Sequence, residues 1–143
     1  MITTTIVILA VALAIMCCGI THNVIMSYGT GGGSVVGNLA VTGDTELNAD
    51  VTLEASSTDI NLDLDFAKAN IQSCVLYCSA ACTVETNSGS APDDTIALVA
   101  GQPTICQNNT EALALFSEDV TSLYLTCSAG GTFSIRLLLD QTP

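Results

Sequence analysis

Residues 85–103 have the sequence ETNSGSAPDDTIALVAGQP, and this stretch decides the fold class because it sets a polar turn between two β-type runs. The run Cys82–Thr86 leads into the polar cluster at residues 87–94, and the run at residues 95–100 follows it. A second turn signal at residues 101–103 closes the unit. Short apolar runs bounded by turn residues predict a hairpin-like β unit.

Each of the turn-forming residues in this cluster has a physical reason to lie in a turn. Gly89 can supply a positive φ, and Pro92 fixes its own φ. The side chains of Asn87, Asp93 and Asp94 can form hydrogen bonds with their own nearby backbone. We therefore expect the cluster to connect two strands.

Two runs on the N-terminal side of this unit alternate between apolar and polar residues. In Thr45–Leu53 one parity is apolar and the other is polar, and residues 60–66 repeat the pattern. The residues expected to face inward are Leu47, Ala49, Val51, Leu53, Ile60, Leu62, Leu64 and Phe66. Strands with one apolar and one polar face are typical of antiparallel sheets.

The rest of the chain after residue 20 carries the same kind of signal. Further strands are predicted at residues 22–28, 34–41, 72–79, 104–107, 112–116, 121–127 and 132–140. Turns are predicted at residues 29–33, 42–44, 55–59, 108–110 and 128–131, and one short helical turn at residues 66–70. Eight to ten short strands without a long helical pattern predict an all-β domain, an antiparallel β-sandwich or a jelly-roll-like fold.

Composition excludes one class of partner. The chain has 14 acidic residues against two basic ones, Lys68 and Arg136, and its net charge is −12. Direct nucleic-acid binding requires cations that displace phosphate counterions, so no direct contact with nucleic acid is expected. Such charge favours a solvated acidic surface, which calcium or a basic partner could neutralise.

Residues 1–20, MITTTIVILAVALAIMCCGI, form an apolar N-terminal segment before a β-sandwich domain at residues 21–143. Three interpretations are open for this segment. It can be a buried or subunit-covered strand or helix, a membrane anchor, or a signal sequence. A signal sequence would lack the usual basic n-region and a clear cleavage site, and an anchor would be of minimal length.

Seven cysteines are the most conspicuous chemical feature. Cys74, Cys78 and Cys82 are four residues apart, which on one continuous strand would place them on one face, and we expect this face to point inward. This spacing matches no zinc pattern built on CxxC pairs. Buried thiols, or one or two disulfides, are the expected outcome, and the vicinal pair Cys17 and Cys18 is a poor structural disulfide.

No catalytic constellation is found in the sequence. His22 is the only histidine and has no motif beside it, and no G-x-S-x-G elbow is present. The carboxylate pairs are Asp63 and Asp65, Asp93 and Asp94, and Glu118 and Asp119. Asp93 and Asp94 could contribute to a calcium site, but no calcium-binding motif supports it, so turn chemistry is preferred. We therefore predict no enzyme, with no catalytic, cofactor-binding or metal-binding residues and no cofactor.

Two short motifs carry less information. The tripeptide at residues 108–110, Asn-Asn-Thr, fits the N-glycosylation pattern, which matters only for a secreted eukaryotic chain. The glycine-rich residues 29–33 lack the lysine and helix start of a phosphate-binding loop.

Residues 84–103, VETNSGSAPDDTIALVAGQP, resemble a segment of small virion-associated proteins of tailed bacteriophages. In those proteins the pattern ETN-x-G-SAPDDT-I-x-L-x-AG-x-P joins two strands of a β domain. Residues 42–48, 119–126 and 135–140 are also similar, so the resemblance covers about residues 21–140. This chain differs from the family in its apolar first 20 residues and in its cysteine content.

The resemblance implies a non-enzymatic structural component of a bacteriophage virion, such as a capsid decoration or cement protein or another head-associated protein. Its expected partners are the major capsid protein, other virion proteins and further copies of itself in a homo-oligomer. It would be located in the virion, after assembly in the host cytoplasm. The alternative is a membrane-tethered or secreted β-sandwich binding module with residues 1–20 as anchor or signal.

Overall fold

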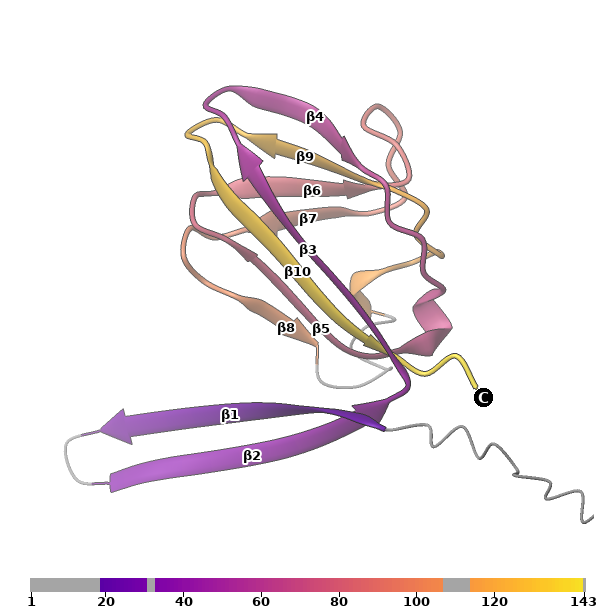
Figure 1. Cartoon of the computed structure of the whole chain (residues 1–143). Coiled ribbons are helices and arrows are strands. Elements are labelled where there is room, and N and C mark those ends of the chain that lie inside the picture. The colour runs from indigo at the N-terminus through magenta and orange to yellow at the C-terminus, as the bar shows by residue number, and fades with distance from the viewer. Residues whose placement is uncertain (1–18, 31–32, 107–113, 143) are drawn as a thin grey trace, which may run out of the picture.

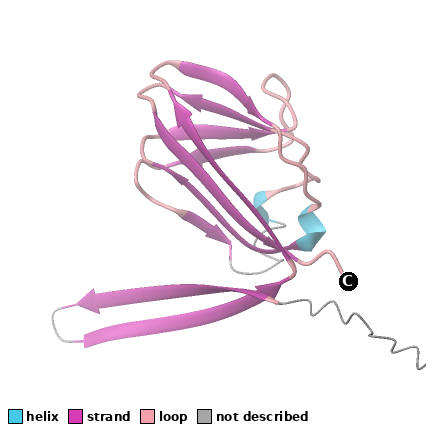
Figure 2. Ribbon diagram, viewed as in Figure 1, coloured by secondary structure: helices cyan, strands magenta, loops and turns pink. Residues whose placement is uncertain are grey.

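The computed structural model describes residues 19–30, 33–106 and 114–142. The strands within these ranges are β1 (Ile20–Thr30), β2 (Gly33–Gly43), β3 (Thr45–Leu53), β4 (Ser57–Leu62), β5 (Ile71–Cys78), β6 (Cys82–Thr86), β7 (Thr95–Leu98), β8 (Thr104–Cys106), β9 (Leu123–Cys127) and β10 (Gly131–Leu139). A short 3-10 helix, η1 (Lys68–Asn70), precedes β5. The all-β prediction is confirmed, and Figure 2 shows how little of the chain is helical.

Eight of these strands form two four-stranded antiparallel sheets that pack face to face (Figure 1). The strand orders are β3-β10-β5-β8 and β4-β9-β6-β7. Counted from β3 as the first strand, the orders read 1-8-3-6 and 2-7-4-5. Strands that are far apart in the sequence lie next to each other in these sheets because two Greek keys wrap around one core. This is the jelly-roll arrangement.

The core lies between the two sheets and consists mainly of aliphatic side chains, together with five cysteines and all three phenylalanines. On β3 the pattern predicted from the sequence holds, since Leu53 is buried, Leu47, Ala49 and Val51 are half-buried, and the intervening residues are exposed. The largest fully buried side chains are Phe116, Phe133, Ile71, Leu76, Leu123, Leu125, Ile135, Leu137, Leu138, Leu139, Val84 and Val120. Burying aliphatic side chains of this size stabilises a fold by about 1.5–3 kcal/mol each.

The predicted strand at residues 60–66 is wrong in its bounds and in the side of the sheet on which one side chain, Ile60, lies. β4 begins at Ser57, inside the predicted polar connection, and ends at Leu62. Its register with β9 shifts between Ser57 and Ile60, and Asp59 has a φ of 49°. Because a bulge rotates the strand, Ile60 is 40% exposed instead of facing inward. Phe66 is buried, but in an isolated bridge with Val120.

Other element boundaries also differ from the predictions. Residues 29, 30 and 33 continue the strands of the first hairpin, so they do not belong to a turn. Residues 42 and 43 lie in β2, and only Asp44 forms the bend before β3. The run at residues 95–100 ends as a strand at Leu98, and within the predicted strand at 112–116 Ala114 and Leu115 are helical. The predicted turn at 108–110 lies outside the described residues.

β1 and β2 form a separate two-stranded sheet that extends away from one end of the sandwich (Figure 1). Its base is fixed on the last strand of the chain. The Asp44 backbone N–H donates to the Leu139 carbonyl at 2.8 Å, and a Cβ added at Gly43 would lie 2.4 Å from that carbonyl oxygen. The Asp44 carboxylate accepts from the Gln141 N–H and the Thr142 hydroxyl, each at 2.9 Å. Only glycine therefore fits where the hairpin meets the sandwich.

Candidate functional site

Asn87 connects the polar loop between β6 and β7 to a distant segment. Its Nδ2 donates to Asp93 Oδ2 at 2.6 Å and to the Asp119 carbonyl at 2.8 Å. Its Oδ1 accepts from the Thr121 N–H at 2.8 Å, and its own N–H donates to the Ser122 carbonyl at 2.9 Å. The predicted local turn residue is therefore a link between two loops at one end of the sandwich.

The left-handed conformation of this loop is at Asn87, with a φ of 64°, and not at Gly89 as the sequence suggested. Asparagine tolerates this region better than most residues because its side chain can form hydrogen bonds close by. Gly89 has a different function in packing. A Cβ at Gly89 would lie 3.0 Å from the Asp59 side chain, so the glycine permits the close approach of this residue of β4.

The carboxylates of Asp93 and Asp94 make contacts within the protein. Asp94 Oδ2 accepts from the Ser117 N–H at 2.8 Å, and the Asp94 N–H donates to the Thr86 hydroxyl at 2.9 Å. Asp93 accepts from Asn87. The two acidic residues thus hold the loop in place, as turn chemistry predicts.

The other two carboxylate pairs are not brought together. Asp63 and Asp65 are exposed and follow β4 instead of lying on it. Asp119 accepts from the Lys68 N–H at 2.9 Å, and the Lys68 ammonium donates to the Ser117 carbonyl. Within the described residues, no group of three or more His, Cys, Asp or Glu side chains is arranged to hold a metal ion.

The five cysteines within the described residues are buried thiols. Cys74 and Cys106 are directly opposite each other on β5 and β8. The hydrogen bond between these two thiols, together with burial, raises the pKa of Cys74 well above its ordinary value. Cys74 therefore stays protonated and is a core side chain, because the thiolate is the reactive form.

Cys78, Cys82 and Cys127 form a second thiol group at the other end of the core. Cys74 and Cys78 share β5, but Cys82 begins β6 in the opposite sheet, so the idea of one continuous strand is wrong. Burial, and then the neighbouring thiols of Cys78 and Cys127, raise the pKa of Cys82 to about 12. The predicted pair Cys17 and Cys18 lies outside the described residues.

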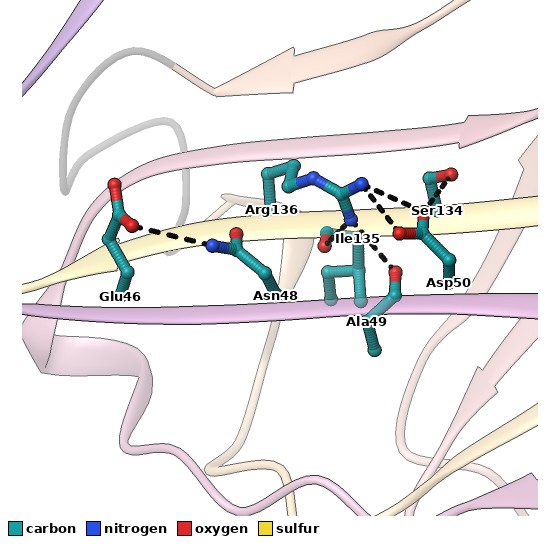
Figure 3. A network of polar contacts seen from close by, with 7 residues as sticks. All are labelled: Glu46, Asn48, Ala49, Asp50, Ser134, Ile135 and Arg136. Carbon is teal, nitrogen blue, oxygen red and sulfur yellow. Dashed lines mark hydrogen bonds and ion pairs between the residues drawn. The ribbon is translucent and has the colours of Figure 1, made fainter.

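Arg136 lies on the outer face of β10 and contacts three neighbouring residues through its two terminal nitrogens (Figure 3). Its Nη2 contacts both carboxylate oxygens of Asp50 at 2.8 Å, and its Nη1 donates to the Ala49 and Ile135 carbonyls at 3.0 and 2.9 Å. The Ser134 hydroxyl donates to Asp50 Oδ1 at 2.6 Å. The hydrogen bond from Ser134 is the largest cause of a lowered pKa at Asp50, and the contacts with Arg136 lower this pKa further.

A shallow groove of about 350 Å³ lies beside this network, between the base of β1 and the outer face of the sheet. It is lined by Thr21, Asn23, Glu46, Asn48, Ser73, Val75 and Arg136. Among the described residues of the lining, Arg136 is the only basic one, and Asp50 already neutralises its guanidinium. The groove therefore offers an anionic ligand no free positive charge.

No functional contact can be assigned to His22, because its side chain lies outside the described part of the structure. Comparison of the chain with protein-family models, with curated proteins and with solved structures gives no match. No helix in the described part of the chain has the length and apolar character needed to span a membrane.

The feature that sequence inspection missed is the distribution of charge. The first charged side chain in the sequence is Asp44, so residues 1–43 contain no Asp, Glu, Lys or Arg. All 14 acidic residues and both basic residues follow in the sandwich part of the chain. The neutral hairpin and the acidic sandwich are thus chemically distinct surfaces, and the break falls where β2 ends. We take the hairpin as the candidate interaction surface.

Proposed function

We propose that this chain is a non-enzymatic structural component of a bacteriophage particle. It would be a capsid decoration or cement protein, or another head-associated protein, that acts through subunit contacts. Its partners would be the major capsid protein or other virion proteins, together with further copies of itself, and it would be located in the virion.

The observation that carries this proposal is the structure of the segment that resembles phage virion proteins. In those proteins the corresponding segment joins two strands of a β domain, and here it joins β6 to β7 through the loop ordered by Asn87. A rigid loop at one end of a sandwich is a suitable contact element, because little conformational entropy is lost when it binds.

The jelly roll adds weaker support. This architecture is common in viral capsid proteins, but lectins and cupins share it, so the fold alone does not assign function.

The network around Arg136 also favours a structural function. Its polar groups stabilise the sheet, and the guanidinium of Arg136 is already paired with Asp50.

Mass spectrometry of purified particles from the phage that encodes this chain tests the proposal. We expect peptides from residues 44–143 at a fixed ratio to the major capsid protein, in particles banded by density and washed in high salt. An abundant host protein measured in the same gradient fractions controls for carry-over. If the chain remains with the host fractions while the capsid protein bands, the proposal fails.

The alternative of a membrane-tethered or secreted binding module rests on the apolar residues 1–20. N-terminal sequencing of the chain recovered from infected cells separates the two. An intact Met1 with free thiols supports the virion proposal. Cleavage near Gly19 with paired cysteines supports the secreted module.

A further inference from the structure

Within the described part of the chain, both edges of the β1-β2 hairpin are open. Its strands pair in one uninterrupted antiparallel register from Ile20 with Gly43 to Thr30 with Gly33. No third strand from the described part of the chain pairs with either of them. In such a ribbon about half of the backbone N–H and C=O groups on each strand point away from the partner strand. These groups form a template for another strand.

The sandwich protects its edges, and the hairpin does not. In the sandwich, the edge strands β7 and β8 have only four and three residues, β4 has a bulge, and β3 carries charged side chains. The two hairpin strands have 11 residues each, with no proline, no charge and no bulge. A two-stranded ribbon is also only marginally stable alone in water. Both observations indicate that the hairpin acquires further strands.

Charge indicates what supplies those strands. Two sandwiches repel each other because the whole net charge of −12 lies in them, whereas two hairpins do not. A strand of 11 residues spans about 35 Å, which is several times the Debye length of about 8 Å at physiological ionic strength. If two copies touch only through their hairpins, away from the bases, their acidic sandwiches therefore lie several Debye lengths apart. At this distance the repulsion between them is screened.

The two edges of the hairpin differ in sequence and in surroundings. β2 contains Gly33, Gly37 and Gly43, whereas β1 contains one glycine, Gly29, and also has Ile20, Ile25 and Tyr28, residue types that β2 lacks. Glycine weakens a strand, and β-branched and aromatic residues favour one. β2 also lies against β5 and β10 near its base. The outer edge of β1 is thus the better pairing edge.

We propose that β1 pairs antiparallel with β1 of a second copy of this chain, so that the two hairpins form one four-stranded sheet around a twofold axis. When a strand pairs antiparallel with its own copy, both copies make the same contacts, so the pair is related by a twofold axis. This pairing involves only copies of this chain, so it stands or falls independently of the proposed place in a virion.

The test measures self-association of the purified full chain by sedimentation velocity at micromolar concentrations and 150 mM salt. We expect dimers for the natural sequence and at least a tenfold weaker association for the double variant Val24→Lys/Ile25→Lys, since charge on an edge strand blocks pairing. Neighbouring positions are changed together because successive residues of a strand present opposite faces. A natural chain that stays monomeric overturns the proposal.

The matched control is Ile60→Lys/Val99→Lys, which adds the same charge at exposed apolar positions of the sandwich, 40% and 59% exposed. It should dimerise like the natural chain. If both double variants lose association equally, or neither does, the hairpin is not the interface and the proposal is wrong.

Hydrogen exchange on the natural chain identifies the edge without any substitution. We expect amides of β1 to become more protected as concentration rises, while the outer amides of β2 do not change. Protection of β1 that is independent of concentration would mean that residues 1–18 of the same chain cover the edge. That result, or protection confined to β2, would contradict the proposal.

Discussion

At the scale of the residue, Asn87 shows how a turn residue can hold two distant loops together. Its side chain uses both Nδ2 donors and accepts at Oδ1, all with groups from residues 93, 119 and 121. Its backbone adds a left-handed conformation with a φ of 64°. Both properties are needed at once, and few residue types have them.

We expect Asn87→Ala to lower the free energy of unfolding by about 2–4 kcal/mol, because it removes several hydrogen bonds and strains a left-handed residue. Asn87→Gly loses the same side-chain bonds but adopts this φ freely, so it should be about 1 kcal/mol less destabilising. Urea denaturation of both variants measures the difference. Equal stability of the alanine variant and the natural chain would show that the link contributes nothing.

Burial and neighbouring thiols raise the pKa of Cys82 from 9.0 to about 12, and this shift predicts a pH dependence. Between these values the thiol is ionised in the unfolded chain and protonated in the folded one. Its contribution to stability is therefore complete below about pH 9 and is lost as the pH rises towards 12.

Replacing Cys82 with alanine should reduce the loss of stability between pH 9 and pH 12, as measured by urea midpoints across that range. Ile105→Ala, at a position 38% exposed, is the control and should leave the slope unchanged. An unchanged slope in the Cys82 variant would mean that other groups cause the loss.

At the scale of the element, β4 shows the limit of alternation as a guide to which side chains are buried. The bulge after Ser57 changes the parity of the strand, so Ile60 is exposed while Leu125, its register partner on β9, is fully buried. A bulge depends on how two strands pair, and the sequence of one strand does not reveal it.

The two residues of this register pair should respond differently to truncation. Leu125→Ala should cost about 2–5 kcal/mol of stability because it leaves a cavity in the core. Ile60→Ala should change stability by no more than about 0.5 kcal/mol, as expected for an exposed position. Denaturation midpoints measure both changes. A large loss of stability in Ile60→Ala would show that the Ile60 side chain faces the core, as expected for a strand that has no bulge.

At the scale of the whole molecule, the separation of a neutral hairpin from an acidic sandwich predicts an unusual response to salt. At 10 mM salt the Debye length is about 30 Å, close to the length of the hairpin, and the two sandwiches of a dimer repel each other. At 150 mM salt this repulsion is screened. Self-association should therefore strengthen as salt rises from 10 to 150 mM.

Sedimentation velocity of the natural chain at the two salt concentrations measures this effect. Association that weakens with salt would instead indicate attraction between opposite charges, and would contradict pairing through the neutral hairpin. The variant Ile60→Lys/Val99→Lys should show a smaller salt effect, since two added lysines reduce the net negative charge of the sandwich.

The sequence by itself determined the kind of secondary structure and most of the strands. Alternation in β3 and β10 is a local property, because successive side chains of a strand point to opposite faces and only one face is buried. It therefore predicted the inward residues of β3 correctly, and it predicted the strand that became β10. The same local pattern placed the loop at residues 87–94 between two strands.

The tertiary structure alone decided which strands are neighbours and where each polar group finds its partner. The order 1-8-3-6 and 2-7-4-5, the two groups of thiols and the contacts of Asn87 all join segments that are far apart in the chain. Such pairings depend on the packing of the whole core, which no single stretch encodes. The open edges of the hairpin became visible for the same reason, because a strand edge is free only in relation to all the other strands.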